Sequence, residues 1–542
     1  MTSGRIQWVS MNQTIDKMLQ PTDIDKQSRL IRFKEIYVLG QTKTSVIGFA
    51  PLLARVFVIP DYMMSENNEL LYKKEFIKDY VNADLLLPEK IIKRLVPKPP
   101  SAFSVCKALR ISFSSGCNLN CVYCYGNANH NPVNTSMENI ERFVKQHPHK
   151  HKIKAVEFHG NGEPTIAMKE IKKATRLIRK EIPNAYIVIQ TNGQFDKKTT
   201  DWLIQNNIRL GFSIDGPEHI HNAQRPARNK RTNSFKKVVK NIEYFKAHNK
   251  RIFVIACVSS QSVSFMPDTY HFLKELGATK ILMNPIVSAG RASSNPDLSA
   301  QAPDIMEFSR QYAQLLKQAY NDRINLGSSF FPPLIESKTS AIRCSISYPK
   351  YMLGVNGDIL SCLEAISLDT PEINPFYWGK LEAGQLIINK TKEQVLKKRN
   401  TYNMPECKQC FVRWYCGGGC ALMSYLEHGD IYKPVDIHCQ ARKMIAQEFL
   451  LFLAQGLLER SRINLQYRTK GIDSLEAFQY KSRKTLPEKN QVEELVKWVK
   501  EANPAKTKQV REYIKADYIG FWGGLRDPPK EADTYRLCSQ LS

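Results

Sequence analysis

The sequence predicts an α/β protein whose centre is an incomplete barrel of six βα units. From residue 108, short apolar runs alternate with longer segments of helical periodicity, a pattern typical of a parallel sheet covered by helices. The chain has 542 residues, more than one ordinary core holds, and its 13 cysteines are unevenly distributed. Further domains, one of them rich in cysteine, are therefore expected around the barrel.

A small α+β domain is expected before the barrel, at residues 1–100. Its predicted strands are Arg32–Leu39, Ser45–Ala50 and Ala54–Ile59, and its predicted helices are Ser65–Val81 and Pro88–Val96. The run Pro97-Lys98-Pro99-Pro100 ends this domain, because consecutive prolines cannot continue a helix.

The barrel itself is placed at residues 101–300. Its predicted strands are Leu109–Ser114, Ala155–His159, Tyr186–Gln190, Arg209–Ile214, Ile252–Val258 and Lys280–Pro285. The helices predicted between them are Met137–Gln146, Met168–Glu181, Thr199–Asn206, Ser234–His248 and Pro267–Leu276. Six such units suit an incomplete barrel, because a closed one of this kind has eight.

Three regions follow the barrel. Residues 301–340 are expected to form a linker or helical bridge. Residues 341–440 are rich in cysteine and glycine and have little periodicity, so bound inorganic ions are expected to replace part of a core there. Residues 441–542 are expected to be a helical extension, with helices at Met444–Arg460 and Gln491–Ala502.

Lysine and arginine outnumber aspartate and glutamate by 78 to 52, which gives a net charge of +26. Such a charge attracts RNA, an anionic membrane surface or an acidic peptide, or simply keeps the chain soluble, and charge alone does not choose among these. The longest apolar stretch, Phe449–Leu458, is interrupted by Gln455 and Gly456 and is shorter than a membrane span. Since no secretory segment is seen either, the protein is expected in the cytoplasm, where clustered cysteines bind metals more often than they form disulfides.

Three cysteines, Cys117, Cys121 and Cys124, form the spacing C-x3-C-x2-C directly after the first barrel strand. Three thiolates on one short loop can hold three irons of a cubane cluster and leave the fourth iron open to a small ligand. A zinc knuckle completed by His130 is the alternative. The string C-N-L-N-C-V-Y-C-Y resembles the radical S-adenosylmethionine (SAM) superfamily, which implies a partial (β/α)6 TIM-like barrel, a 4Fe-4S cluster and SAM as cofactor.

Polar residues and glycines at the ends of the next strands extend this resemblance, because barrel sites assemble at the C-terminal ends of strands. The segment His159–Thr165 is similar to the superfamily's Gly-Gly-Glu motif, with Asn161 as a departure. The other segments are ordinary turn sequences when taken alone, but their order on successive strands matches the superfamily. The resemblance implies cofactor contacts from Gly160, Asn161, Gly162, Glu163, Thr191, Asn192, Ser213, Asp215 and Arg225, with Asn284 as a further candidate.

Seven later cysteines form a second pattern, which resembles the SPASM domain of radical enzymes that mature sulfatases, quinone-cofactor peptides and other peptides. The resemblance implies that one auxiliary 4Fe-4S cluster is held by Cys407, Cys410, Cys416 and Cys439. It implies that a second auxiliary cluster is held by Cys344, Cys362 and Cys420. The second group has only three thiols, so one of its irons is open or takes an external ligand. Structural zinc is the alternative for both groups.

Four further residues are considered besides these patterns. Glu364 is a candidate catalytic proton acceptor, because the catalytic acid of a relative lies close to that position, and a solvated charge is the alternative. Cys106, Cys257 and Cys538 fall outside both patterns and are expected to be small buried or surface residues.

Together, the resemblances imply a maturase that cleaves SAM and uses the 5'-deoxyadenosyl radical to modify a ribosomally made peptide, with a thioether or carbon–carbon crosslink as product. The N-terminal order of three strands and two helices looks like a winged-helix-like peptide-recognition domain, which adds a leader peptide as an extra strand. An unrelated small α/β cap is the alternative, because five short elements are easily mimicked. A precursor peptide with an acidic leader and an electron donor such as flavodoxin or ferredoxin are the expected partners. A membrane and nucleic acid are not expected.

Three other functions remain open at this point. One is formation of formylglycine in a sulfatase, and a second is radical modification of RNA, which only the basic charge suggests. The third is a protein without catalytic activity that binds a cluster or zinc.

Overall fold

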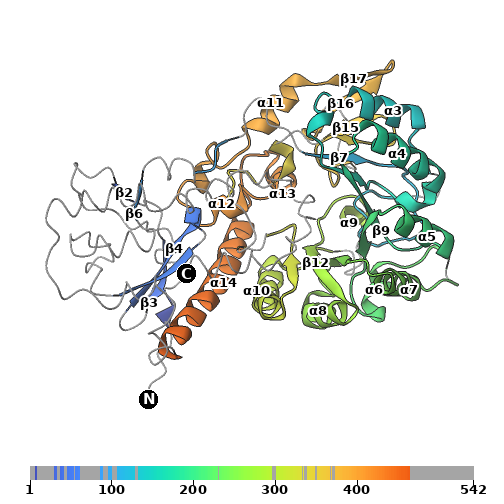
Figure 1. Cartoon of the computed structure of the whole chain (residues 1–542). Helices are drawn as coiled ribbons and strands as arrows, with labels where there is room; N and C mark the ends of the chain where they lie inside the picture. The colour runs from blue at the N-terminus through green and yellow to red at the C-terminus, as the bar shows by residue number, and fades with distance from the viewer. Residues whose placement is uncertain are drawn as a thin grey trace.

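The computed structural model describes most of residues 107–463 and several short segments before them (Figure 1). The described N-terminal segments are residues 7–8, 30–32, 37–41, 45–53, 55–60, 86–88 and 96–99. Within 107–463, the gaps are residues 129–131, 230, 296–300, 332–333, 335–338, 343, 348–350, 367 and 369–372.

One sheet of 11 strands forms the centre of the molecule, in the order β13-β12-β11-β10-β9-β8-β7-β14-β15-β16-β17. The first seven strands of that order pair in parallel. They are β7 (Ala108–Ile111), β8 (Ala155–Phe158), β9 (Tyr186–Thr191), β10 (Arg209–Ser213), β11 (Ile252–Val258), β12 (Ala278–Pro285) and β13 (Asn325–Gly327). The six predicted barrel strands are confirmed, and the seventh, β13, comes from the segment expected to be a bridge.

Helices cover the outer face of these strands (Figure 1). They are α3 (Met137–Gln146), α4 (Met168–Glu181), α5 (Lys197–Gln205), α6 (Glu218–Gln224), α7 (Ser234–Ala247) and α8 (Met266–Glu275). Ser136 and Asp196 cap the first turns of α3 and α5, each accepting a hydrogen bond from a backbone N–H three residues on. The sequence did not predict α6, which is shorter than the window over which helical periodicity becomes visible.

Side chains alternate between the two faces of the barrel strands. Ile111, Phe158 and Phe212 are almost completely buried in the core shared with the helices. Arg110 and Glu157 stand opposite each other on β7 and β8, and Arg110 Nε donates to Glu157 Oε2 at 2.9 Å. The period of two therefore puts an ion pair on the concave face, where an incomplete barrel leaves room for a ligand.

The cysteine-rich region continues the barrel sheet. Its strands are β14 (Met352–Leu353), β15 (Asp358–Leu360), β16 (Tyr377–Glu382) and β17 (Gln385–Ile388), and β14 pairs in parallel with β7. The other three pairings are antiparallel. Helices α11 (Lys390–Lys398), α12 (Arg413–Cys416) and α13 (Ala421–His428) follow. The two regions that the sequence separates at residues 300 and 341 thus share one sheet.

Two long helices connect the barrel with the rest of the chain. Helix α10 (Ile305–Asp322) packs against α14 (Asp436–Ile463), and Lys317 Nζ lies 2.6 Å from Glu448 Oε2. Helix α14 confirms the helix predicted at Met444–Arg460 but begins earlier, so it crosses the boundary expected at residue 441. The helix predicted at Gln491–Ala502 lies outside the described residues. No helix in the described part is long and apolar enough to cross a bilayer.

The N-terminal strands form a separate antiparallel sheet in the order β1-β3-β4-β5. Their bounds are β1 (Gln7–Trp8), β3 (Tyr37–Gln41), β4 (Ser45–Ala50) and β5 (Arg55–Pro60), and a second pair is formed by β2 (Leu30–Arg32) and β6 (Leu86–Pro88). This confirms the three predicted strands, except that the first one begins later, at Tyr37, and ends at Gln41 instead of Leu39. Most of the two predicted helices lies outside the described residues, although Pro88 itself ends β6.

This N-terminal sheet packs beside α14 and the cysteine-rich region (Figure 1). Phe49 meets the ring of Phe411 edge-on at 6.5 Å between centroids, and Tyr415 Oη donates to the carbonyl of Pro51 at 2.8 Å. Phe411 and Tyr415 belong to the loop that carries Cys407, Cys410 and Cys416. The N-terminal sheet and that loop therefore share a core.

Short elements complete the described chain. They are α9 (Arg291–Ser294) and the 3-10 helices at Pro51–Leu53, Lys150–Lys152, Pro164–Ala167, Val263–Phe265, Ser345–Ser347 and Pro405–Cys407.

Candidate functional site

The barrel thiols, Cys117, Cys121 and Cys124, lie on the loop after β7, at the C-terminal end of the strands. Two arginines far along the chain hold this loop, Arg228 after α6 and Arg291 at the start of α9. Arg228 Nε donates to the carbonyl of Cys117 at 2.7 Å, and Arg291 Nη1 donates to that of Cys121 at 2.5 Å. Both arginines also donate to the carbonyl of Ala128. The sequence did not reveal them, because a single arginine outside any motif has no spacing that marks it.

The barrel thiols face a common space. Burial, together with the charges of Glu163 and Cys124, raises the pKa of Cys117 to about 11. Burial also raises the pKa of Cys121, where Arg225 lowers it and the other two thiols raise it. Thiols that influence each other in this way are close together, and their protons must leave when a metal binds. The three cysteines therefore fit the ligands of one metal cluster.

Glu163 is buried beside this loop and accepts four hydrogen bonds. Its Oε1 accepts from Thr165 N at 3.1 Å, from Thr165 Oγ1 at 2.6 Å and from Thr191 Oγ1 at 2.7 Å, and its Oε2 accepts from Asn192 N at 2.7 Å. Burial raises the pKa of this carboxyl, although the hydrogen bonds oppose the change. No basic side chain in the described part forms an ion pair with it. A ligand ammonium group would supply the missing cation.

The glycines before Glu163 allow close backbone packing. A Cβ atom on Gly162 would lie 1.9 Å from the carbonyl oxygen of Gly116, which accepts a hydrogen bond from Glu163 N at 2.9 Å. A Cβ atom on Gly160 would lie 1.9 Å from Ser112 Oγ. A Cβ atom on Gly126 of the cysteine loop would likewise lie too close to the backbone of Asn161. This segment therefore packs directly against β7 and the loop of the barrel thiols.

Asn192 reaches the cysteine loop from the end of β9. Its Nδ2 lies 3.5 Å from Cys117 Sγ and donates to Asn118 Oδ1 at 2.7 Å. Thr191, one residue earlier, is the donor to Glu163 described above. Ser213 is buried at the end of β10. Three predicted cofactor residues thus lie along the ends of neighbouring strands, two of them directly bonded to the loop or to Glu163.

Asp215 forms its contacts with other residues of this chain. Its Oδ2 accepts from Tyr123 Oη at 2.6 Å and lies 3.0 Å from Arg225 Nε, and its Oδ1 accepts from the backbone of Cys257 at 2.9 Å. Arg225 Nη1 in turn lies 3.9 Å from Cys121 Sγ. Asp215 and Arg225 therefore support the cysteine loop from behind. Asn284, on β12, accepts from the backbone of Ser329 at 2.6 Å and so ties the next loop to the barrel.

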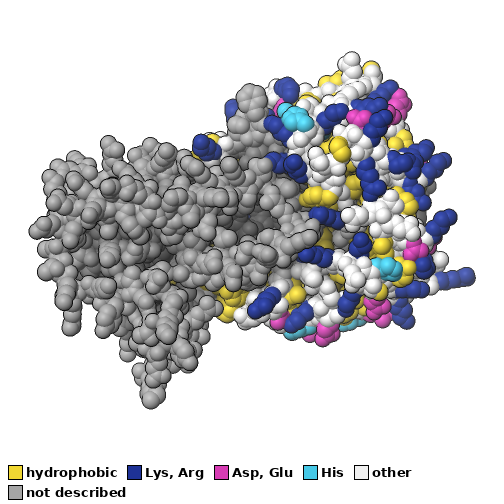
Figure 2. Space-filling view, in the orientation of Figure 1, with side chains coloured by type: hydrophobic (Ala, Val, Ile, Leu, Met, Phe, Trp, Pro, Cys, Tyr) yellow, Lys and Arg dark blue, Asp and Glu magenta, His cyan; other side chains and the backbone are white. Residues whose placement is uncertain are grey.

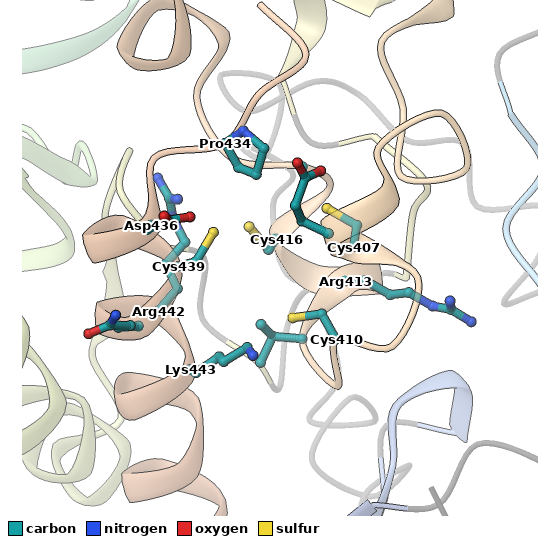
Figure 3. A pocket seen from close by; sticks show the side chains of 13 residues that line it. Cys407, Cys410, Arg413, Cys416, Pro434, Asp436, Cys439, Arg442 and Lys443 are labelled. Carbon is teal, nitrogen blue, oxygen red and sulfur yellow. The ribbon is translucent and has the colours of Figure 1, made fainter. Parts of the chain in front are cut away.

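The four-thiol group, Cys407, Cys410, Cys416 and Cys439, lines one pocket of about 280 Å³. Figure 3 shows Cys439 on α14 and the other three cysteines around α12, with their sulfur atoms directed toward the same space. Burial, together with neighbouring thiols of the group, raises the pKa of Cys410 to about 12 and that of Cys439 to about 11. In the described part, no three His, Cys, Asp or Glu side chains are placed to hold a single metal ion. The four thiols instead surround a pocket large enough for a group bigger than a single metal ion.

The three-thiol group, Cys344, Cys362 and Cys420, lies beside α11 and α13 in a core of its own. Burial raises the pKa of Cys362 and of Cys420, and in both cases the negative charge that raises it most is that of Glu364, followed by that of Cys344. Glu364 is half-buried, and burial raises its own pKa. Its charge also acts on Tyr125 and Cys257 at the barrel mouth. Glu364 thus lies between the three-thiol group and the barrel site.

Basic side chains are spread over the visible face of the barrel, among neutral and acidic ones (Figure 2). Helix α4 alone carries Lys169, Lys172, Lys173, Arg176, Arg179 and Lys180. The charge on this face is distributed and does not single out one docking site.

Comparison with known proteins agrees with this site. A family model described as the radical SAM superfamily matches residues 111–273. The serine-type anaerobic sulfatase-maturating enzyme of Bacteroides thetaiotaomicron is 26% identical over 354 residues, which cover 58% of this chain and 82% of that enzyme. The cysteine-type anaerobic sulfatase-maturating enzyme of Clostridium perfringens is 24% identical over 353 residues, which cover 61% of this chain and 92% of that enzyme.

A solved structure described as native anSMEcpe with bound AdoMet and Cp18Cys peptide has the same fold. It superposes with a TM-score of 0.51 at 20% sequence identity, and the match covers 66% of this chain and 99% of that one. The sheet, the barrel thiols and the family match define a radical SAM enzyme, with SAM and a 4Fe-4S cluster as cofactors. Residues 111–273 match that superfamily, and the chain is a radical SAM enzyme related to the anaerobic sulfatase-maturating enzymes. It is therefore an enzyme, which removes the alternative without catalytic activity.

Proposed function

We propose that this enzyme is a maturase that modifies a ribosomally synthesised peptide and carries three 4Fe-4S clusters. The observation that supports this most is the grouping of ten free cysteines into three sets, two of them in a region that shares a sheet with the barrel. One radical SAM cluster needs three cysteines, so seven thiols remain for auxiliary clusters.

In this proposal, the barrel thiols hold the cluster that binds SAM, and Glu163 binds the amino group of SAM. Thr191, Asn192 and Ser213 contact the cofactor from the ends of β9 and β10, and Gly160, Asn161 and Gly162 let the backbone approach it. When bound, SAM and the reduced cluster supply a 5'-deoxyadenosyl radical that removes a hydrogen atom from the substrate.

The residues of this chain position and enclose that chemistry. Arg228 and Arg291 fix the carbonyls of the cysteine loop, and the Asp215–Arg225 pair fixes Tyr123 beside Cys121. These side chains keep the thiols of the loop in place. Precise placement of reacting groups accounts for a large share of catalysis.

The two auxiliary groups lie farther along the chain. The four-thiol group holds one complete cluster, and the three-thiol group holds a second cluster that leaves one iron for another ligand. Glu364 takes up the proton from the substrate, since it lies between the three-thiol group and the barrel mouth and burial raises the pKa of its carboxyl.

The N-terminal domain binds the leader of the precursor peptide. In the described part its antiparallel sheet ends in β1 and β5, and an outer strand can accept an extra strand; the sheet also shares a core with the loop of the four-thiol group. An acidic leader suits the net charge of +26. A cytoplasmic flavodoxin or ferredoxin supplies the electrons. The product is a thioether or a carbon–carbon crosslink.

Formation of formylglycine in a sulfatase is the second candidate. It is favoured by the relatives, which are serine-type and cysteine-type sulfatase-maturating enzymes at 26% and 24% identity. The leader-binding sheet distinguishes the two candidates, because a leader-dependent enzyme loses substrate binding when that sheet is removed.

The test is anaerobic purification followed by mass spectrometry. About 12 irons per chain are expected for three cubane clusters. Co-expression with a short precursor peptide from a neighbouring gene should change the peptide's mass by the loss of two hydrogens, whereas a sulfatase-derived peptide should stay unmodified. Conversion of the sulfatase peptide to formylglycine instead would replace the proposal with the second candidate. A protein that does not cleave SAM would contradict both.

A further inference from the structure

A buried arginine lies between the two auxiliary cysteine groups. Arg399 directly follows α11 and is 1% exposed. Its guanidinium donates to three backbone carbonyls: Nη2 to Gly418 at 2.7 Å, Nη1 to Gly419 at 3.3 Å, and Nε to Ile431. No carboxylate in the described part forms an ion pair with it. Arg399 is therefore a permanent positive charge in the interior whose hydrogen-bond partners are all neutral.

The carbonyls that Arg399 contacts belong to the link between the two groups. Gly417, Gly418 and Gly419 are the only residues between Cys416 of the four-thiol group and Cys420 of the three-thiol group. All three glycines have positive φ, from 59° to 86°, so the link curls tightly, and the carbonyls of Gly418 and Gly419 accept from the guanidinium. The guanidinium thus holds the point at which the two groups meet.

The main chain of Arg399 is tied to the three-thiol group as well. Its carbonyl accepts a hydrogen bond from Ser347 Oγ, and Ser347 lies in the turn that follows Cys344. One residue therefore touches the backbone beside cysteines of both groups.

The charges around Arg399 come from those cysteines. Burial lowers the pKa of the guanidinium, and thiolates from both groups oppose this change. They are Cys344, Cys420, Cys416 and Cys407. A buried cation without a carboxylate is unfavourable by itself, so the negative charge of loaded clusters would compensate it.

We propose that Arg399 is a counter-cation shared by both auxiliary clusters, and that its charge raises the reduction potential of each and stabilises their bound forms. This inference rests on the proposed function, because it requires clusters in both groups. Each cluster becomes more negative by one charge when it takes up an electron, and a nearby fixed cation stabilises the more negative form. Arg399 is a positioning and tuning residue in this role, since it touches neither SAM nor substrate.

Arg442 provides a matched control. It is buried like Arg399, and its Nε donates to the carbonyl of Phe330 at 3.0 Å. Its charge acts on Cys439 of the four-thiol group, and it is not among the main charges that act on Cys362 and Cys420 of the three-thiol group. Replacing Arg442 should therefore change one auxiliary cluster, while replacing Arg399 should change two.

The experiment uses the full chain with Cys117, Cys121 and Cys124 replaced by alanine, so that only auxiliary clusters remain. About eight irons per chain are expected in this parent protein. Reduction potentials are then measured by titration followed by electron paramagnetic resonance in Arg399→Gln, Arg399→Lys, Arg442→Gln and Arg310→Gln. Arg310 is an exposed residue of α10 paired with Glu307, and its replacement should change nothing.

The expected result is that Arg399→Gln shifts both potentials to lower values, Arg442→Gln shifts one, and Arg399→Lys stays close to the parent. If Arg399→Gln loses iron, retention of both clusters by Arg399→Lys supports the proposal, because lysine keeps the charge. Equal loss in both variants overturns it, and so do unchanged potentials or a shift of one cluster in Arg399→Gln. A parent protein with no auxiliary iron would instead contradict the proposed function itself, and this inference with it.

Discussion

The loop of the barrel thiols and the loop of the four-thiol group both gather cysteines around a space, but they are held in different ways. The first loop follows a buried strand and is fixed by side chains from distant parts of the barrel region, among them Asn192, Arg228 and Arg291. The second is a series of single turns that ends in three glycines with positive φ. The barrel loop is therefore shaped by the sheet, whereas the second loop depends more on what it binds.

The difference has a physical origin in the buried charges. Near the barrel thiols, Arg225 is paired with Asp215 at 3.0 Å. Near the auxiliary groups, Arg399 has carbonyls and thiols around it and no described carboxylate partner. A paired charge is stable without a cluster, whereas an unpaired one favours the loaded state.

The largest effect should come from replacing Cys117, Cys121 and Cys124 together with alanine. Cleavage of SAM should fall below detection, a loss of roughly 1000-fold or more, because the cofactor loses its cluster. The apparent Tm should change little, since the loop keeps its arginine contacts. Anaerobic assay of 5'-deoxyadenosine and a thermal scan check the two parts. Normal cleavage would contradict the cluster assignment.

Replacing the cysteines of the four-thiol group with alanine should, in contrast, lower the stability of the protein. These are Cys407, Cys410, Cys416 and Cys439. We expect a loss of about four irons and an apparent Tm lower by roughly 5–10 °C, since about 2–4 °C is lost per kcal/mol in a domain of this size. The loop should also become sensitive to limited proteolysis. An unchanged Tm would show that this loop is as independent of its cluster as the barrel loop.

Glu163→Gln tests the buried carboxylate that lacks a cation. Binding of SAM should weaken by about 10–100-fold, because a hydrogen bond to a charged group contributes about 1.5–3 kcal/mol. Isothermal titration under anaerobic conditions measures the change. Glu141→Gln, an exposed residue on α3, is the matched control and should bind SAM normally. Equal binding by both variants would exclude Glu163 from the cofactor site.

The smallest effect concerns the pH dependence of stability at the junction of α3 with β14. His147 is buried against Tyr351 at 4.4 Å between ring centroids, and burial lowers its pKa to about 3. The folded state keeps His147 neutral, while the unfolded chain binds a proton below pH about 6.5. The free energy of unfolding should therefore fall by about 1.4 kcal/mol per pH unit below that value from this residue alone.

His147→Asn should make that pH dependence shallower, by about 2 kcal/mol at pH 5. Asparagine keeps an acceptor for the backbone N–H of His149, which donates to His147 Nδ1 at 3.1 Å in the native protein. His151→Asn is the control, because His151 is exposed. Thermal scans between pH 5 and pH 7.5 compare the three proteins. Identical slopes in all of them would exclude His147 as the source.

The sequence by itself determined the local features of this protein. The six barrel strands were predicted within a few residues, because apolar residues repeat with a fixed period wherever one face of an element is buried. The cysteine spacings and the Gly-Glu pair identified the superfamily, because ligands on one short loop must be close in sequence. Helix α14 was also predicted, apart from its early start.

Only the tertiary structure decided how these parts meet. It joined β14 to β7, so the barrel and the cysteine-rich region share one sheet, and it packed the N-terminal sheet against Phe411 and Tyr415. It also turned Asp215 toward Tyr123 and placed Arg399 between two cysteine groups. These contacts join residues far apart in the chain, and they depend on how whole elements pack, which no local period or spacing records.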